Sequence, residues 1–123
     1  MSTTISGTSG VTFPDSTSMV TGQQAVKAWV NFNGTGVVAI RAGYNVSSVT
    51  DTATGIFTIS FTTALQDANY SISGAVADNA GSGQAAIAIN NSSPPSASSF
   101  SIKTPNIGGS LTDSPYTCAA VFR

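Results

Sequence analysis

Apolar and polar residues alternate along most of the chain from residue 26 onward. Over residues 26–32 every second residue is apolar and falls on one side of an extended chain, while Lys27, Trp29 and Asn31 fall on the other. Asn and Gly then mark a turn at residues 33–36, and residues 37–44 resume an extended pattern. We therefore expect a β-hairpin over residues 26–44.

The same two-residue period recurs to the end of the chain. Residues 46–50 and 56–62 predict a second hairpin around a turn at residues 51–55. Helix is disfavoured because β-branched residues, Gly, Ser and Asn dominate, with no Glu. About eight short strands indicate an all-β fold, a jelly-roll-like antiparallel β-sandwich over residues 25–123, with a flattened barrel as the alternative. The further strands expected are residues 70–77, 85–90, 100–103 and 116–123.

Residues 1–24 differ in character, because Ser, Thr and Gly dominate and apolar residues are too sparse for a core. A bend is expected at residues 13–16, where Pro presets its φ angle and turn-favouring residues follow. We interpret the segment as an extended N-terminal arm that docks on other proteins, with a disordered tail as the alternative. The candidate docking residues are Ile5, Val11, Phe13, Pro14, Asp15 and Met19.

Charged residues make up only 7% of the 123 residues, against roughly 25% in an average domain. With five Asp, four Lys or Arg and no His, the chain has few of the groups that acid–base catalysis and metal binding use. Polarity comes instead from 19 Ser and 16 Thr, which can pack against protein without desolvating charges. We expect no enzymatic activity, no cofactor and no metal. The net charge of −1 also predicts no nucleic-acid partner.

Three features could carry chemistry, and each has a simpler interpretation. Residues 81–86 match the Gly-x-Gly-x-x-Gly/Ala pattern of dinucleotide sites, but the required helix and acidic partner are missing, so a hairpin tip is expected. All five Asp fall in predicted turns, where a carboxylate caps its own backbone; a carboxylate pair for glycoside hydrolysis is the alternative. Cys118 is the only cysteine and is expected to be a small buried residue.

Trp29 lies opposite Val30 and Phe32 in its predicted strand. Packing in a subunit interface or second core layer is favoured over an exposed platform for a sugar ring, because Trp gives large contact area with few rotatable bonds. The candidate interface residues are therefore Trp29, Val30 and Phe32. Lys27 and Arg41 are expected to be solvated charges at the sheet edge, with ion pairs to Asp as the alternative.

No stretch approaches the ~18 apolar residues that span a membrane, and the N-terminus lacks the basic and apolar regions of a signal peptide. We therefore expect synthesis in a cytoplasm and no membrane insertion. The Asn-x-Ser sequences that begin at Asn45, Asn69, Asn90 and Asn91 are then incidental to the Ser-rich composition.

Two parts of the chain resemble modules in predicted tail-fibre and other virion proteins of tailed bacteriophages. The first includes AWVNFNGTG at residues 28–36 and GIFTISFTTA at residues 55–64. The second, GVTFPDST at residues 10–17, is similar to a phage-fibre element that usually has Gly at the position of Ser16. Together they cover roughly residues 5–72.

The resemblance implies a homotrimeric, β-rich virion appendage that is often involved in host attachment, and it brings no catalytic residues. We expect a bacteriophage virion protein, made in the host cytoplasm: a short tail-fibre or receptor-binding subunit whose arm docks on the baseplate, a companion fibre or the capsid. A capsid decoration protein is the alternative. Sandwich-end loops would bind a host glycan or protein. The candidate loop residues are Asp78, Asn79, Gln84, Asn91, Pro94, Pro95, Asn106 and Asp113.

Overall fold

The computed structural model describes residues 4–6, 10–16, 18–19, 26–77, 83 and 86–123. Every regular element within these ranges is a β-strand. The strands are β1 (Thr4–Ser6), β2 (Gly10–Thr12), β3 (Ser18–Met19), β4 (Val26–Asn33), β5 (Ala39–Tyr44), β6 (Val46–Ala53), β7 (Ile56–Phe61), β8 (Ser71–Val76), β9 (Ala88–Ile89), β10 (Ser99–Lys103) and β11 (Thr117–Phe122).

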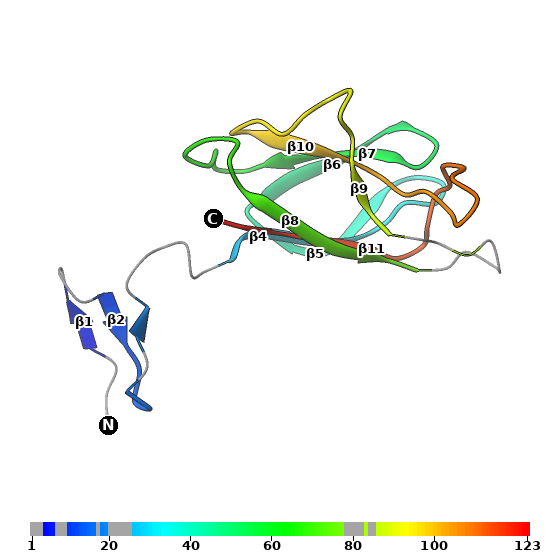
Figure 1. Cartoon of the computed structure of the whole chain (residues 1–123). Helices are drawn as coiled ribbons and strands as arrows, with labels where there is room; N and C mark the ends of the chain where they lie inside the picture. The colour runs from blue at the N-terminus through cyan, green and yellow to red at the C-terminus, as the bar shows by residue number, and fades with distance from the viewer. Residues whose placement is uncertain (1–3, 7–9, 17, 20–25, 78–82, 84–85) are drawn as a thin grey trace.

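Strands β4 to β11 form two four-stranded sheets that pack face to face (Figure 1). The strand order is β5-β4-β11-β8 in one sheet and β6-β7-β10-β9 in the other, and neighbouring strands are antiparallel. The predicted antiparallel β-sandwich is confirmed, and so are the hairpins β4–β5 and β6–β7.

The inner faces of the two sheets share one buried layer. Phe32 of β4 and Phe57 of β7 meet edge to face, with ring centroids 5.1 Å apart. Phe100 of β10 packs against Phe61 of β7 at 5.6 Å between centroids. The rest of the buried core comprises Ala28, Val30, Ile59, Ile102, Ala119 and Val121. Alternation along β4 and β7 therefore correctly grouped the residues that share one face, and that face is the buried one.

This core corrects the predicted subunit interface. Val30 and Phe32 are 2% and 0% exposed, so neither side chain has surface left for a second subunit. The reason is the position of β4 in the middle of its sheet, where one side of the strand faces the opposite sheet. Only the other side of β4, which carries Trp29, remains available.

Two further predictions change in detail. Asp51 lies within β6 and not in a turn, because β6 continues through two register shifts to Ala53. Cys118 is partly buried and lies on the outer side of β11, opposite Asn31 of β4. The residues of β11 that face inward are Thr117, Ala119 and Val121, which pair with buried core residues of β4.

The N-terminal segment is more ordered than an extended arm. Strands β1, β2 and β3 form a small antiparallel sheet that belongs to neither layer of the sandwich (Figure 1). The expected bend is present, since the Ser16 N–H donates to the Phe13 carbonyl at 3.0 Å. Ser16 has a φ of 69°, a left-handed conformation that favours glycine.

Successive connections between the sandwich strands alternate between its two ends. Hydrogen bonds join Gly34 to Ser114 and Thr104 to Gly55 at one end, which we call the distal end. At the other end, the Leu65 N–H donates to the Ala97 carbonyl. This second end, which we call the proximal end, is where β4 begins and therefore where the N-terminal segment enters.

Candidate functional site

The outer face of the sheet β5-β4-β11-β8 carries four exposed aromatic side chains. Trp29, Tyr44, Tyr116 and Phe122 are 40%, 58%, 54% and 42% exposed, and we call them the aromatic face. Trp29 and Tyr44 are direct cross-strand partners, so their rings lie side by side on the same side of the sheet. A cluster of exposed rings of this kind marks an interaction surface.

The aromatic face is nearly free of charge. None of the five Asp lies in β4, β5, β8 or β11. Arg41 stacks over the ring of Tyr116, with 4.0 Å between its guanidinium carbon and the ring centroid. Its Nη1 also donates to Asn31 Oδ1 at 3.5 Å. Arg41 is thus an exposed charge on the edge strand β5, as expected, and a register shift in the β4–β5 ladder places it on the outer face beside Asn31.

The outer face of the other sheet has a different chemistry. Its cross-strand pairs Thr50–Thr58 and Ser48–Ser60 present hydroxyl groups. The hydroxyls of Thr52 and Thr58 lie 3.3 Å apart and bond to each other. The described residues place no exposed aromatic side chain on this face. A partner that binds through aromatic contacts would therefore bind at the aromatic face of the sheet β5-β4-β11-β8.

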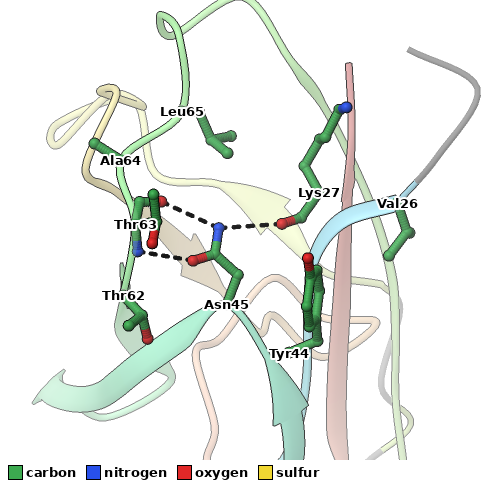
Figure 2. Close-up of a pocket in the computed structure, with 8 residues that line it drawn as sticks. All are labelled: Val26, Lys27, Tyr44, Asn45, Thr62, Thr63, Ala64 and Leu65. Carbon is green, nitrogen blue, oxygen red and sulfur yellow. Dashed lines mark hydrogen bonds between the residues drawn. The ribbon is translucent and has the colours of Figure 1, made fainter. Parts of the chain in front are cut away.

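A pocket of about 580 Å³ lies at the proximal end (Figure 2). Asn45 is the single residue between β5 and β6, and the chain crosses from one sheet to the other at this point. Its side-chain Nδ2 donates to the carbonyls of Lys27 and Thr63, each at 3.1 Å, and its Oδ1 accepts the Thr63 N–H at 2.7 Å. All three bonds tie neighbouring strands or loops to the crossing.

The amide of Asn45 is therefore a structural clamp. Both of its polar atoms are used within the protein, and its φ of 54° is a conformation that Asn tolerates better than other side chains. From the sequence, Asn45 is expected only to begin an incidental Asn-x-Ser sequence. The available signal was its place directly between two predicted strands with no other turn residue.

Hydrogen bonds connect the loops at the distal end to one another. The Gly34 N–H donates to the Ser114 carbonyl at 2.9 Å, and the Gly55 N–H donates to Asp113 Oδ1 at 2.6 Å. The Ser114 hydroxyl reaches the Ala77 carbonyl at 2.7 Å. A single loop, residues 104–116, thus joins the turns that follow β4, β6 and β8.

The structure divides the predicted loop residues between the two ends. Asn106 and Asp113 lie together in the distal loop, where the Asn106 Oδ1 accepts the Ser110 N–H at 2.9 Å. Asn91, Pro94 and Pro95 lie in the connection from β9 to β10, at the proximal end. Asp78, Asn79 and Gln84 lie outside the described residues.

The most exposed apolar side chains at the distal end were not predicted. Val37 and Ile107 are 90% and 79% exposed. Their sequence signal is weak, because Val37 stands at the start of the predicted strand 37–44 and Ile107 in a predicted loop, each next to Gly. They give the distal end an apolar surface beside its polar loop backbone.

The N-terminal sheet brings several predicted docking residues together. Ile5 pairs with Val11 and Val11 pairs with Met19, so the three share one row across β1, β2 and β3. Phe13 is 39% exposed in the turn after β2, where Pro14 and Asp15 are also exposed. The strand register thus aligns three of the predicted docking residues, and Phe13 is the exposed aromatic residue of the turn.

An ion pair fastens the C-terminus at the proximal end. The Arg123 Nη2 lies 2.6 Å from Asp67 Oδ2, and its Nε donates to Asp67 Oδ1 at 2.9 Å. This two-point contact, together with the Asn69 N–H, holds the pKa of the Asp67 carboxyl well below its usual range. Asp67 also caps the backbone two residues on, as expected for an aspartate in a turn.

Comparison with protein-family models, with curated proteins and with solved structures found no match. The likeness to phage fibre modules therefore remains a prediction from the residues quoted above. Among the described residues, no three His, Cys, Asp or Glu side chains gather as metal ligands. That part of the chain also has no helix long and apolar enough to cross a membrane.

Replacing Asn45 tests the clamp. We expect Asn45→Ala to lower the free energy of unfolding by about 3 kcal/mol, because three hydrogen bonds worth roughly 1 kcal/mol each are lost. Asn45→Gly loses the same bonds but accepts positive φ without strain, so it should be about 1 kcal/mol more stable than Asn45→Ala. Urea unfolding at one fixed protein concentration measures both. Equal stabilities of the two variants would show that the φ angle is not a constraint.

The Asp67–Arg123 pair predicts a pH dependence. Because the folded-state pKa of Asp67 is lowered from its usual value of 3.8, the pair stabilises the protein above that value and loses its effect as the pH falls below it. The difference in unfolding midpoint between wild type and Asp67→Asn should be constant above about pH 5 and shrink toward about pH 2. In an Arg123→Gln background, Asp67→Asn should change the unfolding midpoint less than it does in the wild type above about pH 5. If the difference in midpoint between wild type and Asp67→Asn is the same at about pH 2 as at about pH 5, the ion pair is not its cause.

Proposed function

We propose that this protein is a structural subunit of a tailed-bacteriophage virion, a short tail-fibre or receptor-binding subunit that attaches the virion to the host surface. The observation that carries the proposal is the aromatic face: four exposed rings on an almost uncharged sheet, opposite a sheet lined by hydroxyls. A lone domain in solution gains nothing from exposing such a surface, whereas a subunit of an assembly buries it. The role is structural and not enzymatic.

The partners in this proposal are further copies of the chain and other virion proteins. The aromatic face supports self-association, which the family resemblance specifies as a homotrimer. The small sheet of β1, β2 and β3 is the contact with the baseplate, a companion fibre or the capsid, since it lies outside the sandwich and gathers apolar residues in one row.

The two ends of the sandwich suit different tasks. The N-terminal segment enters at the proximal end, so a subunit held by that segment presents its distal end away from the particle. Asn106 and Asp113, with the exposed Val37 and Ile107 nearby, remain the candidates for contact with a host glycan or protein. Asn91, Pro94 and Pro95 face the attached end and are weaker candidates. Three copies of a weak distal site would act together on a repetitive cell surface.

A capsid decoration protein needs the same uncharged, interface-rich β domain and is the alternative. The number of copies per virion separates the two proposals, because a capsid is decorated by far more copies than a tail carries. Quantitative mass spectrometry of purified virions, with antibody labelling in electron micrographs, gives both the copy number and the location.

Deleting residues 1–24 tests the attachment proposal. We expect the truncated protein to retain the β-sheet circular dichroism and cooperative unfolding of the full chain, because the core lies within β4 to β11. We expect its incorporation into virions to fall at least about tenfold, because the docking contact is lost. The matched control is Ser48→Ala, a change on the hydroxyl face that should leave incorporation unchanged. Incorporation of the truncated protein at the wild-type level would overturn the role given to this segment.

A further inference from the structure

The aromatic face has a bulky half and a hollow half. One cross-strand row runs from Tyr44 of β5 through Trp29 of β4 and Ala120 of β11 to Ser73 of β8. The first two residues are large rings and the last two are among the smallest side chains. The rings of Tyr44 and Trp29 therefore form a ridge along one margin of the face, beside a low area over β11 and β8.

The low area is a measurable hollow of about 400 Å³. For scale, an apolar protein cavity of about 150 Å³ is enough to bind benzene. An aromatic side chain from outside therefore fits into this hollow. Small side chains form its floor, among them Ser73, Ala75, Cys118 and Ala120. Trp29 borders it on the ridge side, and Phe122 borders it toward the proximal end.

We propose that the ridge of Tyr44 and Trp29 on one copy of the chain seats in the hollow over β11 and β8 of a second copy. The inference deepens the proposed function and rests on its self-association. Because ridge and hollow lie at opposite margins of the same face, every ridge has a hollow to enter, whether two copies pair about a twofold axis or several close a ring.

Charge and area favour a second copy as the occupant. The four strands of this face carry no acidic residue, Arg41 is stacked on Tyr116, and Lys27 lies at the proximal start of β4 beside the pocket there, so two such faces meet without burying an unpaired carboxylate. Four rings that each bury 150–250 Å² when covered, and that are about half exposed here, offer roughly 400 Å². That is about half of the ~800 Å² that each partner contributes to a standard interface, and the small side chains of the hollow extend it.

Cys118 in the hollow allows a direct test by cross-linking. We expect purified Tyr44→Cys to form disulfide-linked oligomers under mild oxidation, because residue 44 of one copy meets Cys118 of the next. The two positions cannot bond within one chain, since β5 and β11 are two strands apart, about 10 Å, and a disulfide needs Cα atoms within about 7 Å. Adding Cys118→Ser should abolish the bands on a non-reducing gel. The matched control is Thr50→Cys on the hydroxyl face, which should give no more cross-linking than wild type.

A second variant avoids dependence on cysteine chemistry. Ala120→Trp fills the hollow from within and should raise the dissociation constant of the oligomer by about tenfold or more, as measured by sedimentation. The inference is overturned if Tyr44→Cys cross-links no more than Thr50→Cys, if the bands persist without Cys118, or if Ala120→Trp leaves association unchanged. A wild-type protein that is monomeric at all concentrations also overturns it. Failure of the proposed function is a different result, namely absence of the protein from purified virions.

Discussion

Phe32 and Phe57 meet edge to face between the two sheets, and this contact sits in the only buried layer that the described residues form. Everything else is organised around the central layer. The strands need it to fix their register, because one face of each central strand must be covered, and the loops inherit their positions from the strand ends.

Nine of the ten aromatic residues are divided between the inside and the outside of the sandwich, and the tenth, Phe13, lies in the N-terminal segment. Phe32, Phe57, Phe61 and Phe100 fill the core together with the partly buried Tyr70. The rings of Trp29, Tyr44, Tyr116 and Phe122 lie on one outer face only. A chain with so few charges still avoids a uniformly adhesive surface, because Ser and Thr cover the opposite sheet. One outer face of the sandwich can therefore bury aromatic surface against a partner, whereas the other presents hydroxyl groups to solvent. A subunit of an ordered assembly needs such a difference between its faces.

Alternation along the sequence was sufficient to predict the sandwich and its two local hairpins. Alternation reports which residues share a face, but it does not report which face is inside, and Val30 and Phe32 were assigned to an interface for that reason. It also missed the clamp of Asn45, whose partners at Lys27 and Thr63 each lie 18 residues away along the chain. The predicted strand order was enough to assign each loop to one end of the sandwich, because consecutive antiparallel strands place their connections at alternating ends. The row of Ile5, Val11 and Met19 depends on a pairing of very short strands that carries almost no sequence signal.

Two hydrogen bonds fasten the distal loops to one another, one from the Gly55 N–H to Asp113 Oδ1 and one from the Gly34 N–H to the Ser114 carbonyl. Val37 and Ile107 take no part in these bonds through their side chains, and they are the most exposed apolar groups at that end. The residues whose hydrogen bonds hold the distal loops in place therefore differ from the residues whose side chains are exposed there. Side chains at the tip can be exchanged without loosening these bonds, so a lineage of such proteins can change what it touches while keeping the same fold.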